Sequence, residues 1–340
     1  MSQTLSHEDL LKLVDGCLGQ GKVVAGPTLV KPDLCAYAAL RASDQLVLKD
    51  FIHPANSIKG FFFPRHEPIC VYRLNGNDVE LEDVDPPKTE QIIIGVRPCD
   101  AAALPILDHV FNWDYADKFY NERRENTTVV TLACTDYDDN CFCTSVGLGP
   151  AAEKGSDAML LPLGDGGYEV RCFTDKGKAL FEGKTTPSDK TGSASEGPAR
   201  KIDVKWIEEA LEDDYENPAW KTISLRCLGC GACAYNCPTC HCFDIVDEGD
   251  AAGGLRVKNW DSCQFGQFTV HASGHNPRAN QGQRQRQRIQ HKFRIYPEKF
   301  NEILCTGCGA CTRNCPVALG VLNTLEALRA AAAPDTSEVG

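Results

Sequence analysis

The chain has 340 residues with 19 cysteines, and 35 Lys and Arg against 47 Asp and Glu leave a net charge of −12. A hydrophobic content of 42% excludes a wholly disordered chain, and the length suggests two or three domains. No apolar run approaches the roughly 20 residues of a membrane span, and residues 1–11 lack the pattern of an export signal. We therefore expect a cytoplasmic protein without a membrane span. In that reducing compartment disulfides are rare, so metal binding is the leading reason for so many cysteines.

Residues 1–181 are predicted to form an α/β domain. Apolar residues recur at helical spacing in His7–Leu18 and Ala101–Phe111, and Thr4 or Ser6 is the expected cap of the first helix. Short β-branched or apolar runs predict four strands, which are Gln45–Ile52, Gln91–Val96, Thr128–Ala133 and Ala158–Leu163.

The rest of the chain divides into three parts. Residues 182–200 are rich in Gly, Ser, Thr and Pro without an apolar period, which predicts a flexible linker. A second domain is expected over residues 201–331, with helices near Ile202–Leu211 and Leu319–Ala331. Residues 332–340 are expected to form a frayed tail.

One internal repeat is the most informative feature of the sequence. Residues 227–238 read CLGCGACAYNCP and residues 305–316 read CTGCGACTRNCP, so nine of twelve positions are identical. Each copy has the spacing C-x2-C-x2-C-x3-C-P, which binds cubane 4Fe–4S clusters. The spacing suits a cube because three thiolates from one tight turn reach three corners, and the glycines permit the turn.

The fourth cysteine of such a run ligates the other cluster in two-cluster ferredoxins. The expected ligands of one cluster are therefore Cys227, Cys230, Cys233 and Cys315. The expected ligands of the other cluster are Cys305, Cys308, Cys311 and Cys237. A zinc ribbon pairs two C-x2-C knuckles and does not call for four cysteines and a proline in each run.

The long gap between the two runs favours a mainly α-helical two-cluster ferredoxin-type domain over a small βαββαβ sandwich. Polar sequence compatible with helices occupies Gln264–His271 and Gln281–Phe293, although Leu255–Trp260 has the composition of a strand.

Three further cysteines, Cys240, Cys242 and Cys263, lie near the first run in CPTCHCFDI and WDSC. They are either buried reduced thiols beside a cluster, or ligands of a further cluster or substitutes for one of the eight ligands above, and these interpretations stay open. His241 is a candidate ligand or a hydrogen-bond donor to one.

A second group of cysteines follows two predicted strands of the first domain. Cys99 follows Gln91–Val96, and Cys134 follows the next strand and is succeeded by Cys141 and Cys143. Because ligands bind at the carboxyl edge of open α/β sheets, we expect these four thiols to hold a third cluster, with Asp100 as an alternative oxygen ligand. The alternative is that Cys99 belongs to the core and the others are loop thiols. The isolated cysteines are expected to be packing residues, namely Cys17, Cys35, Cys70 and Cys172.

The basic tract Arg278–Lys292 has three arginines at 284, 286 and 288, followed by His291 and Lys292. An acidic chain does not favour nucleic-acid binding. The cations are expected either to raise the reduction potential of an anionic cluster or to dock an acidic partner. The sequence contains neither G-x-G-x-x-G nor G-x4-G-K-[ST], so a flavin or NAD(P)H is expected on a partner.

Several motifs occur in an order that resembles one family. They are GVRPCDAAAL, RREN, CFC with GLGP, CPTCHCFDI, WDSC, ASGHNPR, RQRIQHKF and CTGCGAC-x3-CP. The chain is similar, from about Phe51 to Leu325, to the iron–sulfur electron-transfer subunit of anaerobic sulfite reductase and to the β subunit of cytosolic sulfhydrogenases. The resemblance implies an electron-transfer role beside one partner that binds flavin and NAD(P)H and another that is a catalytic or heterodisulfide-reductase-like subunit.

Three functions follow as hypotheses. The leading one is relay of single electrons within an oxidoreductase complex of anaerobic metabolism, without catalysis by the chain itself. A catalytic subunit that reduces a small substrate at the N-terminal thiols is the second. The third, a redox-sensing scaffold, is disfavoured by the lack of any DNA-reading motif.

Overall fold

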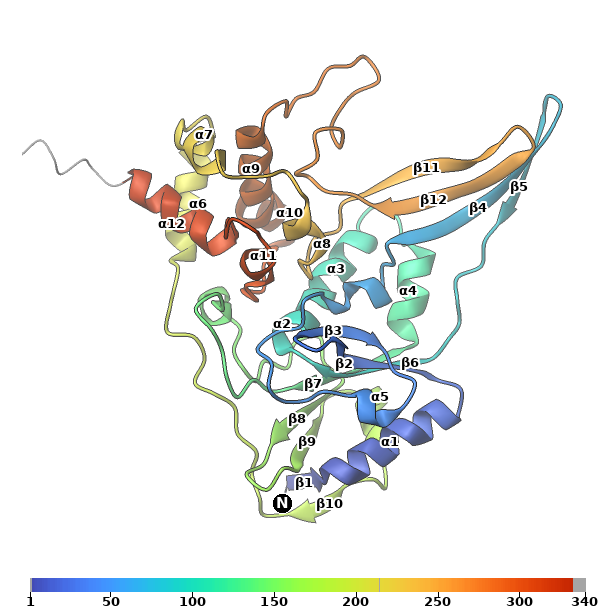
Figure 1. The fold of residues 1–340 in the computed structure, drawn as a ribbon, viewed down its shortest axis with the longest axis vertical. Helices are drawn as coiled ribbons and strands as arrows, with labels where there is room; N and C mark the ends of the chain where they lie inside the picture. Colours follow the sequence, from blue (N-terminus) through green and yellow to red (C-terminus); the bar gives the residue numbers. More distant parts are fainter. Residues whose placement is uncertain (1, 214, 333–340) are drawn as a thin grey trace, which may run out of the picture.

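The computed structural model describes residues 2–213 and 215–332, so most of the predicted tail lies outside the described residues. Figure 1 shows a sheet with helices at the foot of the molecule, a helical part above it, and a long arm of strands that projects to one side. The sheet has eight strands in the order β10 (Thr186–Ser188), β1 (Ser2–Leu5), β9 (Tyr168–Cys172), β8 (Ala158–Pro162), β7 (Thr127–Leu132), β6 (Gln91–Val96), β2 (Val23–Lys31) and β3 (Leu34–Ala39).

The centre of this sheet is parallel. Strands β2, β6, β7 and β8 pair in parallel, and antiparallel strands flank them on both sides. Residues that alternate along β6 point to opposite faces, since Ile92 and Ile94 join one apolar cluster and Ile93 joins another. Both faces are therefore buried, which explains why the strands at the centre read as continuous apolar runs.

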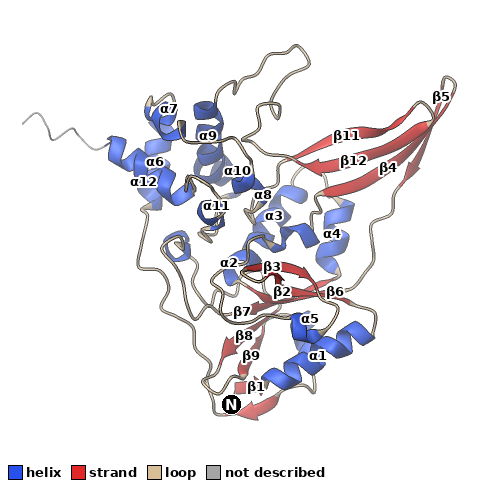
Figure 2. Cartoon of the chain, in the orientation of Figure 1, coloured by secondary structure: helices blue, strands red, loops and turns tan. Residues whose placement is uncertain are grey.

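Helices cover the two faces of the sheet, as Figure 2 shows. One face packs against α1 (His7–Gly19) and α5 (Asp175–Phe181). The helices on the other face are α2 (Pro98–Ala101), α3 (Ala103–Phe111) and α4 (Lys118–Glu125). Ser6 caps α1, because its hydroxyl accepts a hydrogen bond from the Asp9 amide. The α/β prediction for the first part of the chain agrees with this arrangement.

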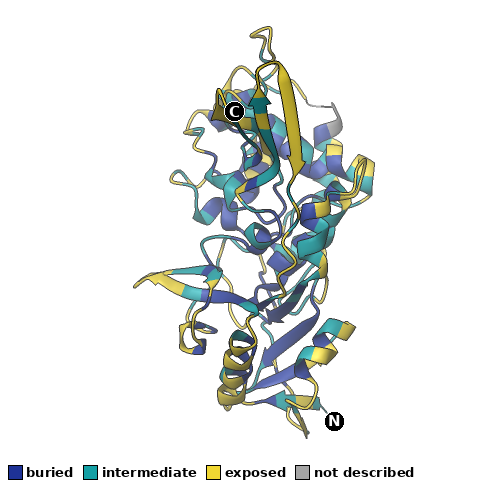
Figure 3. Ribbon diagram, turned by 90° about the vertical axis from the view of Figure 1, so that its right-hand side faces the viewer, coloured by how far each residue is buried: buried dark blue, intermediate teal, exposed yellow. Residues whose placement is uncertain are grey.

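The arm is a second, four-stranded antiparallel sheet that joins distant parts of the chain. Its order is β11 (Phe243–Asp250), β12 (Gly253–Trp260), β4 (His66–Asn75) and β5 (Asp78–Asp83). Strand β12 pairs with β4 from Gly253 opposite Arg73 to Asn259 opposite His66. Figure 3 shows that much of the arm is exposed, and every residue of β5 is exposed. The strand expected at Leu255–Trp260 is present, but its partner β11 makes this part of the chain less purely helical than predicted.

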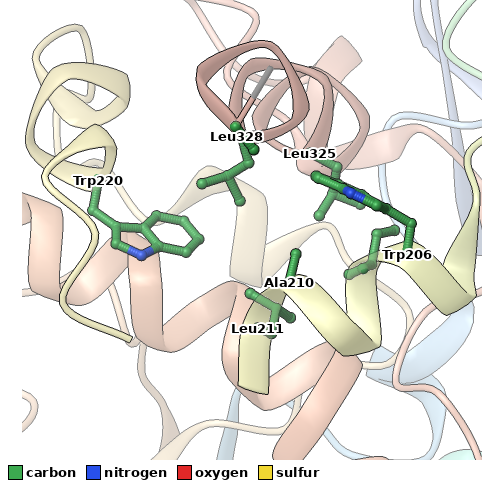
Figure 4. Close-up of a pocket in the computed structure, with 8 residues that line it drawn as sticks. Trp206, Ala210, Leu211, Trp220, Leu325 and Leu328 are labelled. Atoms are coloured by element: carbon green, nitrogen blue, oxygen red, sulfur yellow. The ribbon is translucent and has the colours of Figure 1, made fainter. Parts of the chain in front are cut away.

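The helical part comprises α6 (Val204–Asp213), α7 (Ala219–Ser224), α8 (Ala232–Tyr235), α9 (Gln281–Gln290), the π-helical turn η4 (His291–Ile295), α10 (Tyr296–Phe300), α11 (Ala310–Arg313) and α12 (Val321–Ala332). A small apolar hollow lies where α6, α7 and α12 meet, and its lining includes Trp206, Trp220, Leu325 and Leu328 (Figure 4). No cysteine lines this hollow, so it is a gap in helix packing that does not concern the thiols.

Two predicted elements are wrong. Gln45–Ile52 is not a strand: only Ser43–Gln45 (η1) is regular there, and Asp50 has a φ of 63°, which breaks an extended run. Gln264–His271 is a chain of turns and not a helix. A second short 3₁₀ turn, η2 (Ile58–Phe61), and a third, η3 (Cys143–Val146), complete the regular structure.

The segment 182–200, predicted to be a flexible linker, is bonded to the sheet at several points. It contains β10, which pairs with β1, and the Gly192 amide donates to Glu169. The Ser195 amide donates to the Cys134 carbonyl, so the segment also touches the thiol-bearing edge of the sheet. The division into domains at this segment stays a prediction.

Candidate metal centres

The two copies of the cysteine repeat have the same backbone geometry. Gly229 and Gly307 have φ angles of 66° and 64°, and Gly231 and Gly309 have φ angles of 74° and 72°. In each copy the second glycine precedes a one-turn helix, α8 or α11. Left-handed angles of this kind favour glycine, which explains the glycines of the motif.

The first thiol site is a hollow of about 350 Å³ whose lining includes Cys227, Cys230, Cys233 and Cys315. The first three come from one repeat and the fourth from the other, as the exchange of ligands requires. Hydrogen-bond donors already point at two of these sulfurs. The Gln281 side-chain amide lies 3.2 Å from the Cys227 sulfur, and the Leu319 amide lies 3.2 Å from the Cys315 sulfur.

The second thiol site consists of Cys305, Cys308, Cys311 and Cys237. Burial raises the pKa of Cys305 to about 12, and the nearby charges of Cys237 and Cys311 add to this effect. Burial also raises the pKa of Cys308 well above its ordinary value, again with Cys237 and Cys311 close by. These thiols therefore lie near one another in a dry environment.

The groups around Cys237 favour its thiolate form. A hydrogen bond from the Cys240 thiol, with the Lys292 charge and the Thr239 hydroxyl alongside, lowers the pKa of Cys237 well below its ordinary value, although burial opposes them. The Lys292 ammonium lies 3.4 Å from the Cys237 sulfur. Thiolates are the form of cysteine that binds metal, so this residue is prepared to be a ligand.

Buried donors without partners test whether these two sites suit an anionic cluster. Arg288 is buried, and its Nε and one Nη atom have no hydrogen-bond partner among the described residues. The neighbouring thiols raise the pKa of Arg288 although burial opposes them, and these thiols include Cys233 of the first site and Cys311 of the second. A buried guanidinium with unpaired N–H groups is costly unless an acceptor faces it. Cluster sulfides and thiolates are such acceptors, so the residues fit the group.

The third thiol site lies at the carboxyl edge of the parallel sheet. Strands β6 and β7 are parallel neighbours, and Cys99 and Cys134 follow their ends. Cys141 and Cys143 come from the next loop, and all four thiols line one hollow of about 410 Å³. The helix near Asp100 begins at Pro98, so Cys99 lies within the short helix α2. The structure thus brings together the four cysteines that we expected at this edge.

The second and third sites are in direct contact. The Phe142 amide donates to the Gly307 carbonyl over 2.9 Å, and Cys308 lines the hollow of the third site. Arg313 spans the junction: it forms an ion pair of 2.7 Å with Asp138 and lies 3.0 Å from the Cys141 sulfur. The first and second sites are also neighbours, since Cys233 and Cys311 influence each other and both influence Arg288, so the three thiol sites follow one another.

The other three cysteines near the first repeat each lie close to another thiol, and buried lysine side chains lie near them. Cys240 contacts Cys237, and a hydrogen bond from Cys242 lowers the pKa of Cys263 to about 6. Lys59, which is buried, donates to the carbonyls of Ala234 and Cys240. His241 is half-buried, with its Nδ1 atom 3.0 Å from the Thr239 carbonyl. The role of these thiols as ligands of a further centre stays a prediction.

The basic tract divides according to where its side chains lie. Arg288 and Lys292 lie among the thiols, whereas Arg286 forms an ion pair with Glu216 and Arg284 bonds to Gln281. Of the isolated cysteines, Cys17 and Cys172 pack in the main core below the sheet, and Cys35 and Cys70 are half-buried on β3 and β4.

Sequence reasoning missed several residues that line these sites. His53 and Lys59 come from a segment without a regular spacing of apolar residues. Arg97 lies in the motif GVRPCDAAAL, but the motif gives no indication of what its side chain does. Arg313 occupies a variable position of the repeat, so comparing the two copies is the one signal that could have found it. Among the described residues, no three His, Cys, Asp or Glu side chains form a group suited to a single metal ion.

Comparison with known proteins supports the chemistry expected of these sites. Residues 226–319 match a family model described as a 4Fe-4S dicluster domain. The chain is 29% identical over 307 residues to sulfhydrogenase 2 subunit beta of Pyrococcus furiosus. The aligned region covers 86% of this chain and 88% of that protein. No solved structure matches the chain. The expected resemblance to sulfhydrogenase β subunits is confirmed. Within residues 2–213 and 215–332, no helix has the length and apolar character needed to cross a bilayer.

Proposed function

We propose that this relative of the sulfhydrogenase β subunits relays single electrons between a flavin- and NAD(P)H-binding partner and a catalytic or heterodisulfide-reductase-like subunit. The observation that carries the proposal is the series of three neighbouring thiol sites, in which the two repeats exchange their fourth cysteine. A 4Fe–4S cluster supplies one-electron redox chemistry when it is bound. The chain itself makes no bonds in a substrate.

The first and second thiol sites would each hold one 4Fe–4S cluster, and the third would hold another. The protein supplies the cysteine ligands of each cluster, excludes water from it and places fixed positive charges beside it. Donors to the cysteine sulfurs, such as the Val321 amide at 3.3 Å from Cys311, favour the thiolates and raise the potential of the centre they hold. Arg288 and Lys292 act in the same direction because the reduced form of a cluster carries more negative charge.

The first thiol site is the expected point of exchange with a partner. Among the described cysteines, Cys230 alone is exposed, and Leu225 and Leu228 beside it are 75% and 67% exposed. The neighbouring side chains of Lys221 and Arg226 are exposed as well. A redox centre near an apolar, basic surface suits short-range electron exchange with an acidic partner protein.

The test is iron and acid-labile sulfide in anaerobically purified protein, together with EPR of the reduced protein. Three clusters predict about twelve irons per chain, and the two ferredoxin clusters alone predict about eight. Fewer than about six irons would contradict the dicluster assignment. A paired Cys141→Ala and Cys143→Ala variant should lose about four irons, and unchanged iron would remove the third cluster.

Co-purification tests the relay. Under anoxic conditions the chain should be isolated with a flavoprotein, and reduced nicotinamide should then reduce its clusters only when that partner is present. Purified chain that reduces an acceptor by itself, with a chemical reductant and no partner, would favour the catalytic alternative instead.

A further inference from the structure

We infer that the outer edge of strand β5 is a docking site for an extended segment of a partner protein in which apolar and basic residues alternate. Such a segment would add one strand to the arm. The inference goes beyond the proposed relay, because it does not depend on any bound cluster.

The first observation is the position of β5 in its sheet. This strand is last in the order of the arm and, among the described strands, pairs only with β4, from Asp78 opposite Asn75 to Asp83 opposite Cys70. Figure 1 shows β5 at the outer border of the arm, and all six of its residues are exposed. On its other side β5 therefore presents backbone N–H and C=O groups without a strand partner in the described part of the chain. Strand addition uses such an edge.

The second observation is the alternation of side chains along β5. Successive side chains of a strand point to opposite faces of the sheet. Val79 and Leu81 therefore share one face, and these residues are 60% and 73% exposed. Asp78, Glu80 and Glu82 share the other face. An added strand has to match both faces in turn, because residues directly opposite each other on neighbouring strands are in contact.

The apolar face of β5 continues onto the next strand. Leu81 lies opposite Tyr72, and Val79 lies opposite Leu74. The Tyr72 side chain extends further across the sheet, since a Cβ atom on Gly254 of β12 would lie 2.8 Å from its hydroxyl oxygen. The apolar face is therefore wider than one strand, and apolar side chains of an added strand would pack beside it.

The third observation is the charge of this edge. Four of the six residues of β5 are acidic and none is basic. Arg73 on β4 forms an ion pair of 2.9 Å with Glu82, whereas neither Asp78 nor Glu80 forms an ion pair within the described residues. Lysine or arginine side chains on an added strand would pair with these two carboxylates.

The same charges argue against a second copy of the chain as the occupant. If two β5 strands paired in antiparallel in the register centred on Glu80, Glu80 of one copy would face Glu80 of the other, and Asp78 would face Glu82. Like charges directly opposite each other destabilise a sheet. The acidic residues thus protect the edge from self-association, while Val79 and Leu81 remain available to a different, basic protein.

The test measures binding of a short synthetic peptide of alternating valine and lysine to the full-length chain under anoxic conditions. The control is a peptide of the same composition with its valines and lysines in separate blocks. The alternating peptide should bind at least about tenfold more tightly than the control, and the β5 amides should exchange more slowly with deuterium when it is bound. Equal binding of the two peptides would show a contact through net charge alone, and no binding would show that the edge accepts no strand. Either result would overturn the inference.

Variants assign the binding to the two faces of β5. Glu80→Lys and Leu81→Ser should each weaken binding of the alternating peptide about threefold to tenfold, the first by repulsion and the second by loss of packing. Leu29→Ser is the matched control for Leu81→Ser, because Leu29 is 55% exposed on β2. Asp33→Lys is the control for Glu80→Lys, because Asp33 is exposed in the turn between β2 and β3. Unchanged binding in both β5 variants would contradict docking at this edge.

Iron content and oligomeric state complete the test. Each substituted side chain is exposed, so every variant should keep the wild-type iron content, which shows that the chain has folded. Too few irons in the wild type would contradict the proposed function without changing the result expected for the peptides. A dimer of the wild type that Leu81→Ser dissociates would identify a second copy as the occupant and overturn the inference.

Discussion

Arg288 lies between two of the proposed redox centres. Its side chain is buried, and it faces Cys233 of the first thiol site and Cys311 of the second. Within the part of the chain that the structure describes, only one of its nitrogens has a hydrogen-bond partner, the Leu319 carbonyl at 3.4 Å. A charge in this position stabilises the reduced form of both centres, so one side chain is expected to set two potentials together.

Substitution Arg288→Gln should therefore lower the potentials of both ferredoxin clusters. At an effective dielectric constant near 20, a unit charge about 6–8 Å away contributes about 2–3 kcal/mol, which for one electron corresponds to about 90–130 mV. Potentiometric titration followed by EPR measures the change. Arg286→Gln is the control, since Arg286 lies on the same helix but pairs with Glu216. Unchanged potentials in folded Arg288→Gln protein would contradict this assignment.

His291 makes stability depend on pH. Burial lowers the pKa of His291 to about 3, with the neighbouring ring of His241 as a further cause. In the unfolded chain His291 binds a proton as the pH falls through about 6.5, whereas in the folded chain it does not. The free energy of unfolding therefore falls as the pH falls.

Between pH 6.5 and pH 5.5, His291→Gln should show a pH slope of unfolding free energy that is smaller than that of the wild type by up to about 1 kcal/mol per unit. Anaerobic denaturant titration at several pH values measures the slope. His7→Gln should keep the wild-type slope, because His7 is an exposed residue at the start of α1. Equal slopes for wild type and His291→Gln would show that His291 does not remain neutral.

At the scale of elements, the two cysteine turns have the same backbone conformation but different neighbouring residues. A Cβ atom on Gly229 would meet the Gln281 side chain at 3.3 Å, whereas one on Gly307 would lie 2.6 Å from the backbone of Cys143. The flexible Gln281 side chain can move away from an added methyl group more easily than the Cys143 backbone can. The second turn is therefore the junction between the ferredoxin part and the thiol-bearing sheet edge.

Gly229→Ala and Gly307→Ala form a matched pair for testing this junction. Both should lose about 1–3 kcal/mol of stability to the left-handed backbone. Only Gly307→Ala should also displace Cys143 and reduce the iron bound at the third thiol site. Thermal unfolding and iron content of the two variants provide the comparison, and equal iron content would argue against close coupling of these sites.

The elements that sequence reasoning predicted correctly are those with a local signal. Strands β6, β7 and β8 are apolar because both faces of the parallel sheet are buried, and the first helix shows its cap at Ser6. The thiol sites followed from spacing and from the rule that parallel strands end at one edge. The arm was missed in large part because β5 and β11 are acidic and exposed, so their pairing depends on partners far along the chain. His53 was missed because a lone histidine in irregular chain carries no spacing signal.

At the scale of the whole molecule, the two halves of the chain share structure. Strand β12 from the second half pairs with β4 from the first, and the Trp260 indole donates to the Phe63 carbonyl over 3.0 Å. The Tyr296 hydroxyl likewise donates to the Ile106 carbonyl over 2.7 Å. Separating the halves would expose an apolar sheet edge and leave buried polar groups without partners.

We therefore expect residues 201–340, produced alone, to aggregate or to remain partly unfolded even under anoxic conditions with iron and sulfide supplied. Co-production with residues 1–200 should yield a soluble complex that is detected by size-exclusion chromatography. A soluble fragment of residues 201–340 with about eight irons would show that the ferredoxin part folds independently.

The exchange of cysteines between the repeats has a consequence for how the protein is made. In the proposed assignment the first thiol site needs Cys315 and the second needs Cys237, so each site combines an early and a late part of the chain. A nascent chain that has not yet emerged beyond Cys315 can offer only three thiols to the first site, and a chain that stops before Cys305 can complete neither. With this assignment, we expect both ferredoxin centres to be completed only at the end of synthesis, and a truncated product to lack a complete centre that could react with oxygen.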